Sequence, residues 1–167
     1  MVLLTGVVGC QTARVAHPLT SDLAGNAPET QLEFWHTLAT RPVTSNDEAF
    51  HGLLLYLDNH DESSDYSARV AMLKQRRMLP GSFSEPAERA VSRGTLAYAV
   101  ARALELKGGW VMHVFGNSQR YAVRELEYLE VFPTSSPNQT FSGTEFVGVV
   151  GKMEDYQREH GQIPPAS

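Results

Sequence analysis

Apolar residues recur at helical spacing in three stretches of the chain. The pattern covers residues 30–40, 65–79 and 119–132, and it predicts an amphipathic helix in each of them. Proline follows every stretch, at Pro42, Pro80 and Pro133. A residue before proline is disfavoured in helical geometry, so each predicted helix ends in a turn that leads to a further segment.

A second helix is predicted after each of these turns. Its start has a fixed pattern: an apolar residue, then Ser or Thr, then polar residues, then apolar positions at helical spacing. The hydroxyl residue can accept a hydrogen bond from a free backbone N–H of the first turn, as an N-cap does. The expected caps are Thr44, Ser92 and Ser142. Asp47 and Glu145 stand three residues after their caps, as in a capping box, whereas Thr95 takes that place in the middle helix.

These capped starts recur about every 50 residues, so the chain reads as three helix–loop–helix units in tandem. Such units need neighbours to cover their apolar faces. The sequence therefore predicts an all-α fold of three repeats around a shared pseudo-threefold core. Two segments stand outside the pattern. Residues 58–65 are expected to form a solvated acidic linker, and residues 107–116 are an apolar stretch whose conformation the pattern does not decide.

Composition and charge narrow the classes of function. The 167 residues suit one domain, and a net charge of −5 without a basic cluster argues against nucleic-acid binding. No run of about 20 apolar residues could span a bilayer. A single cysteine excludes an internal disulfide and a multi-cysteine zinc site, and the six histidines lack metal-ligand spacing. We expect no metal, no cofactor and no catalytic site.

The one cysteine, Cys10, ends an apolar N-terminal segment with the residues Val7-Val8-Gly9 before it. This context resembles the lipobox of bacterial lipoproteins, and the resemblance implies a signal segment over residues 1–10 with lipid carried on Cys10. Residues 11–28 are then expected to form a flexible tether. The alternative is an ordinary apolar segment with a buried cysteine. The lipoprotein interpretation predicts a bacterial envelope protein anchored to the membrane by its lipid and facing the periplasm or the exterior.

The middle unit carries a more specific pattern. The loop Gly81-Ser82-Phe83-Ser84-Glu85-Pro86 is followed by the helix start Val91-Ser92-Arg93-Gly94. This resembles a repeat of the S-layer homology family, in which a Gly-x-Phe-x-Pro-like loop precedes a Thr-Arg-Ala-Glu-like motif. The resemblance implies one three-repeat domain over residues 29–157, followed by a polar C-terminal tail over residues 158–167.

The S-layer homology resemblance also implies a function and a site. That family fixes envelope proteins to cell-wall polysaccharide, often an acidic polymer whose carboxylate pairs with the motif arginine. Only Arg93 holds the arginine position here, while Ser45 and Gly143 hold it in the other units. The expected glycan-binding residues are Ser92, Arg93 and Trp110, the last as a ring on which a sugar could stack.

Three other interpretations stay open. Arg93 can be a solvated residue or an ion-pair partner of Glu88. Loss of the motif in two units favours an envelope protein–protein interaction or a structural module without a glycan site. A glycan-acting enzyme would need two carboxylates facing each other across a cleft, for which Glu48, Glu88 and Glu145 are candidates.

Overall fold

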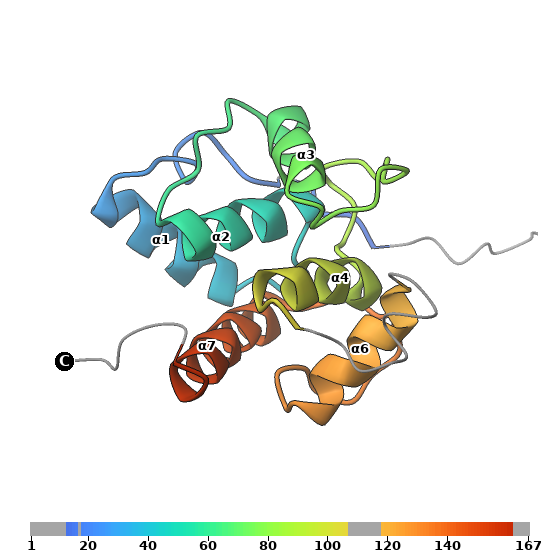
Figure 1. Ribbon diagram of the computed structural model, residues 1–167. Helices are drawn as coiled ribbons and strands as arrows, with labels where there is room; N and C mark the ends of the chain where they lie inside the picture. Colours follow the sequence, from blue (N-terminus) through green and yellow to red (C-terminus); the bar gives the residue numbers. More distant parts are fainter. Residues whose placement is uncertain (1–12, 17, 107–117, 162–167) are drawn as a thin grey trace, which may run out of the picture.

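The computed structural model describes residues 13–16, 18–106 and 118–161 (Figure 1). These residues form six α helices and no β strand, so the predicted all-α class is confirmed for this part of the chain. The helices are α1 (Pro28–Ala39), α2 (Asn46–Asp58), α3 (Tyr66–Gln75), α4 (Arg93–Ala103), α6 (Gln119–Tyr128) and α7 (Gly143–Glu159). None of the described helices is long and apolar enough to cross a membrane. The predicted signal segment with Cys10 and the ring of Trp110 lie outside the described residues.

Serine caps fix the starts of α2, α4 and α7. The hydroxyls of Ser92 and Ser142 accept from the third backbone N–H of their helices, as predicted. The prediction of Thr44 is wrong by one residue, because Ser45 caps α2 and forms a capping box with Glu48. The backbone N–H and carbonyl of Thr44 are instead bonded to neighbouring segments, which keeps this residue extended.

The segments that lead into α2, α4 and α7 are joined by backbone hydrogen bonds. The first residue of α2 donates its N–H to a carbonyl of the segment before α4. In the same way the first residue of α4 donates to the segment before α7, and that of α7 to the segment before α2. The bonds are Asn46 to Arg89 (2.8 Å), Arg93 to Gln139 (2.8 Å) and Gly143 to Arg41 (2.9 Å). They satisfy N–H groups that have no partner inside a helix, and they close in a ring.

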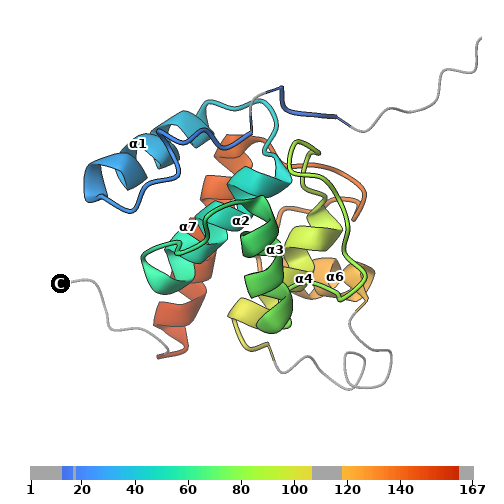
Figure 2. The ribbon, with the colours of Figure 1, turned by 90° about the horizontal axis from the view of Figure 1, so that it is seen from above.

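The helices α1, α3 and α6 pack in a regular order that the sequence did not indicate. α1 packs on α7, α3 on α2 and α6 on α4 (Figures 1 and 2). Each of them therefore contacts chiefly the capped helix that precedes it, if α7 is counted as the helix before α1. For α3 the connection from Asp58 to Tyr66 is short, which keeps this helix close to α2. The predicted units are therefore interlocked with their neighbours.

The core lies along α2 and α4. Every residue from Asn46 to Leu55 is buried, and so is every residue from Arg93 to Ala101. By contrast, α6 buries one face. Phenylalanines from several segments fill the centre, among them Phe50, Phe132, Phe141 and Phe146, and their rings meet edge-on or stacked.

Part of the predicted tether contacts the helical body. Val15 donates its N–H to the carbonyl of Glu88 at 2.8 Å, and Ala90 donates to Ala13 at 2.9 Å. Leu19 and Leu23 pack against the core. At the other end, α7 continues to Glu159 and so passes the predicted domain boundary at residue 157.

A buried polar cluster joins α2, α3 and the linker between them. An oxygen of Asp61 lies 2.7 Å from Nδ1 of His51 and 2.5 Å from Nε of Arg69, and Arg69 also donates to Asp47 at 2.7 Å. The side chain of Asp61 is fully buried, which corrects the expectation that the linker is solvated throughout. Burial alone would raise the pKa of Asp61, but hydrogen bonds from His51, Arg69 and Ser63 hold it well below the ordinary value.

We expect Asp61→Asn to lower the free energy of unfolding by about 3 kcal/mol at pH 7, because it leaves Arg69 buried with one carboxylate. A lowered pKa stabilises the fold above the unfolded value of about 4 and loses this effect as the pH falls further. The gap between variant and wild type should therefore narrow between pH 5 and pH 2. Urea unfolding followed by circular dichroism measures both effects. The control Glu62→Gln changes an exposed carboxylate of the same linker, and an equal loss there would contradict the assignment.

Gly143 lies where α7 meets the end of α1. A Cβ atom on Gly143 would stand 1.5 Å from the carbonyl oxygen of Leu38, a distance that the backbone cannot accommodate without moving. The arginine position of the third unit therefore has no room for any side chain.

Gly143→Ala should destabilise the protein by about 3 kcal/mol, because α1 and α7 must separate to admit the methyl group. Gly148→Ala and Gly151→Ala are matched controls in the same helix, since both positions are exposed and a Cβ there meets nothing within 4 Å. Both should raise stability by about 0.5 kcal/mol through helix propensity. Thermal unfolding compares the three variants, and a neutral Gly143→Ala would show that the close approach is not required.

Candidate functional site

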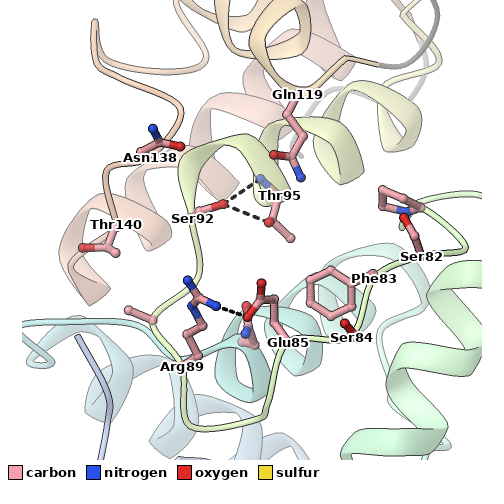
Figure 3. Close-up of a pocket in the computed structure, with 13 residues that line it drawn as sticks. Ser82, Phe83, Ser84, Glu85, Arg89, Ser92, Thr95, Gln119, Asn138 and Thr140 are labelled. Atoms are coloured by element: carbon pink, nitrogen blue, oxygen red, sulfur yellow. Dashed lines mark hydrogen bonds and ion pairs between the residues drawn. The ribbon is translucent and has the colours of Figure 1, made fainter. Parts of the chain in front are cut away.

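A cavity of about 520 Å³ opens at the start of α4 (Figure 3). We call it the α4 cavity. Its walls are the start of α2, the loop before α4, the first turn of α4, the first turn of α6 and the loop before α7. The lining residues are Asn46, Pro80, Ser82, Phe83, Ser84, Glu85, Arg89, Ala90, Ser92, Thr95, Gln119, Asn138 and Thr140.

Uncharged polar groups dominate the α4 cavity. Eight lining residues carry a hydroxyl or a side-chain amide, and such groups can both donate and accept hydrogen bonds. Phe83 adds an aromatic ring on one side (Figure 3). Of the described residues that line it, Glu85 is the one carboxylate and Arg89 the one cation, and they form an ion pair with each other. The charges of the lining therefore cancel locally.

The first turn of α4 presents two hydroxyls to the cavity. Ser92 Oγ accepts from the N–H of Thr95 at 3.1 Å and lies 2.9 Å from the Thr95 hydroxyl. In α2 and α7 a glutamate holds the position of Thr95 and folds back onto its serine cap. The helix start whose serine cap lines the cavity is thus the one of the three without a capping-box carboxylate.

The loop before α7 is held firmly against the start of α4. The N–H groups of Arg93 and Gly94 donate to the carbonyls of Gln139 and Pro137, at 2.8 and 2.9 Å. Asn138, which lies between these two anchors, is exposed and lines the cavity. A polar side chain on a fixed backbone loses little freedom when it binds a ligand.

Arg93 lies beside the α4 cavity but is not part of its lining. Its side chain is 6% exposed, and Nη2 donates to Glu145 at 2.5 Å. The guanidinium carbon stands 4.4 Å from the ring centre of Phe141, a cation–π distance. Of the two residues expected to bind glycan that the structure describes, Ser92 therefore lines the cavity, whereas Arg93 holds α4 to α7.

The alternative prediction, an ion pair of Arg93 with Glu88, is also wrong in its partner, because Arg93 pairs with Glu145. Glu88 pairs with Arg14 at 3.2 Å, on the outside of the loop. Burial alone would raise the pKa of Glu145, but hydrogen bonds from Ser142 and Arg93 hold it below the ordinary value. Glu48 pairs in the same way with Arg41 at 3.1 Å. The three carboxylates considered for catalysis are thus engaged in ion pairs, each in a different place.

Sequence reasoning missed several lining residues. Gln119, Asn138 and Thr140 come from segments far from the loop of the middle unit, and no local pattern sets them apart. The loop residues Ser82 and Phe83 had a signal, since they belong to the segment that resembles the S-layer homology repeat. Comparison of the chain with models of protein families, with curated proteins and with solved structures finds no match in any of the three.

The pair of Arg93 with Glu145 should contribute to stability across the α4–α7 contact. Arg93→Ala is expected to lower the free energy of unfolding by about 2 kcal/mol, the scale of a hydrogen bond to a charged group. A double-mutant cycle with Glu145→Gln should give a coupling energy of about 1 kcal/mol. The matched control is a second double-mutant cycle that combines Arg93→Ala with Glu88→Gln. Coupling to Glu88 instead of Glu145 would contradict the observed pairing.

Proposed function

We propose that this domain is a non-catalytic module of the S-layer homology type that binds cell-wall glycan in the α4 cavity. In this proposal lipid on Cys10 anchors the protein in a bacterial envelope, and the cavity holds the polysaccharide. The observation that carries the proposal is the lining of the cavity, in which hydroxyls and amides surround one aromatic ring.

The packing of the helices supports a pseudo-threefold arrangement. α1, α3 and α6 pack in turn on α7, α2 and α4, and the three capped helices exchange backbone hydrogen bonds in one direction around a ring. Three copies of one unit related by rotation would have these properties. The arrangement agrees with the S-layer homology resemblance in the middle unit.

The chemistry of the α4 cavity supports a sugar as its ligand. A sugar ring offers hydroxyls that donate and accept, as the polar groups of the lining do. Phe83 packs edge-on against Phe50 and is 9% exposed, so it adds a small apolar surface to the cavity. The cavity volume of about 520 Å³ is within the range of ligand sites, roughly 300–1,000 Å³. Glu85 is the one carboxylate among the described lining residues, so no second carboxylate of the lining faces it across the cavity as glycoside hydrolysis requires.

The engagement of Arg93 favours one alternative. Since the Arg93 guanidinium is buried and its Nη2 donates to Glu145, the group that holds an acidic glycan in the family faces the protein interior here. An envelope protein could then be the partner in place of a glycan. A stable co-purifying envelope protein, together with no retention on cell wall, would support this second function.

Co-sedimentation of the full chain with purified cell wall tests the proposal. Wild type should sediment with the wall, and Asn138→Ala should weaken retention about threefold, the loss of one hydrogen bond. Thr95→Glu brings a carboxylate into the cavity beside Glu85 and should weaken it at least tenfold. Its thermal midpoint should stay at or above that of wild type, because the glutamate can complete the capping box of α4.

The matched control is Thr20→Glu, which adds the same charge at an exposed position outside the cavity lining and should leave retention unchanged. Equal retention of wild type, Asn138→Ala and Thr95→Glu would refute binding in the α4 cavity. Release of reducing sugar from the wall by the wild-type protein would refute the non-catalytic assignment.

A further inference from the structure

A second pocket adjoins the α4 cavity. It has a volume of about 580 Å³ and is more open to solvent. Its lining residues are Ser118, Gln119, Arg120, Ser136, Pro137 and Asn138. Gln119 and Asn138 line both spaces, so the two pockets lie side by side with these side chains between them.

The junction between the pockets is built by close packing. A Cβ atom on Gly94 would lie 2.8 Å from Oε1 of Gln119, so the glycine leaves room for this side chain to lie across the start of α4. Figure 3 shows the Gln119 side chain reaching toward Thr95. On the other side, Asn138 is held by the backbone bonds of its two neighbours to Arg93 and Gly94.

The charges around the two pockets argue against an acidic ligand in the deeper one. Arg89 is paired with Glu85, and Arg93 with Glu145. A ligand carboxylate in the α4 cavity would have to displace one of these acids or lie close to Glu85, which costs free energy by like-charge repulsion. Arg120 stands in the exposed pocket, where solvent screens its charge.

We infer that the two pockets form one groove for an uncharged, linear oligosaccharide of at least two sugar units, with Gln119 and Asn138 at the junction. Each pocket alone has the volume of a ligand site, so one sugar unit does not fill the groove. The ligand class differs from the acidic polymer that the family resemblance implies. This inference rests on the proposed glycan-binding function.

The experiment uses oligosaccharides released from purified cell wall by limited glycosidase digestion. Anion exchange separates neutral from acidic fragments, and gel filtration sorts each pool by length. Isothermal titration calorimetry with the full chain then measures the affinity of each fraction. We expect the neutral pool to bind, with a gain of at least tenfold from one sugar unit to three. Acidic fragments of equal length should bind at least tenfold more weakly.

Two serine variants separate the pockets. Ser82 lines only the α4 cavity and Ser118 only the second pocket, and both residues are exposed. The Ser118 hydroxyl makes no cap hydrogen bond to α6, so its removal leaves that helix start unchanged. Ser82→Ala should weaken binding of one unit and of three units by the same factor. Ser118→Ala should weaken only the longer fragments, by about threefold.

The outcomes distinguish this inference from the proposed function. Affinity that does not depend on length, or an identical effect of both serine variants at every length, would overturn the two-pocket groove. Tighter binding of acidic fragments, lost in Arg120→Gln, would overturn the neutral ligand class while the glycan-binding function stands. Wall retention without binding of any fragment would also overturn the groove. Failure of both the fragments and the intact wall to bind would refute the proposed function itself.

Discussion

The ring of backbone hydrogen bonds at the starts of α2, α4 and α7 is the constraint on which the structure depends. The first N–H groups of a helix have no partner within it, and here the first residue of each of these helices is buried. Each helix start donates its first N–H to a carbonyl of the segment before the next capped helix. Leaving such an N–H buried without a partner costs about 1–3 kcal/mol, so the segments must stay in register. A serine hydroxyl at every cap completes the arrangement.

This register also determines where a ligand site can form. Because Arg93 and Gly94 hold the loop before α7 by its backbone, the side chain of Asn138 projects from a fixed position beside the Ser92 cap. The α4 cavity is therefore bordered by four segments that are distant in the sequence. Its polar groups owe their positions to the same bonds that stabilise the fold. For the proposed glycan, such a cavity would be prearranged.

The sequence predicted what local physics decides and missed what distant contacts decide. Helix starts were predicted well because a serine cap acts within four residues, and the one-residue error at Thr44 arose where Ser45 offered an equally local signal. The ends of α3 and α6 came earlier than predicted, since Arg77 and Glu130 adopt left-handed backbone angles without the glycine that normally marks them. The partner of Arg93, 52 residues away, left no trace in the local pattern.

Thr95 shows how stability and ligand chemistry compete at one position. In α2 and α7 the cap carries a glutamate, and each of these carboxylates also binds an arginine, Arg41 or Arg93. A glutamate at residue 95 would complete the α4 cap in the same way, but it would place a second negative charge in a cavity that already contains Glu85. Threonine lacks the carboxylate that would accept the second hydrogen bond of the capping box, and it leaves a hydroxyl in the lining. A departure from the best local choice is expected where a site needs another chemistry, and here it keeps the cavity neutral.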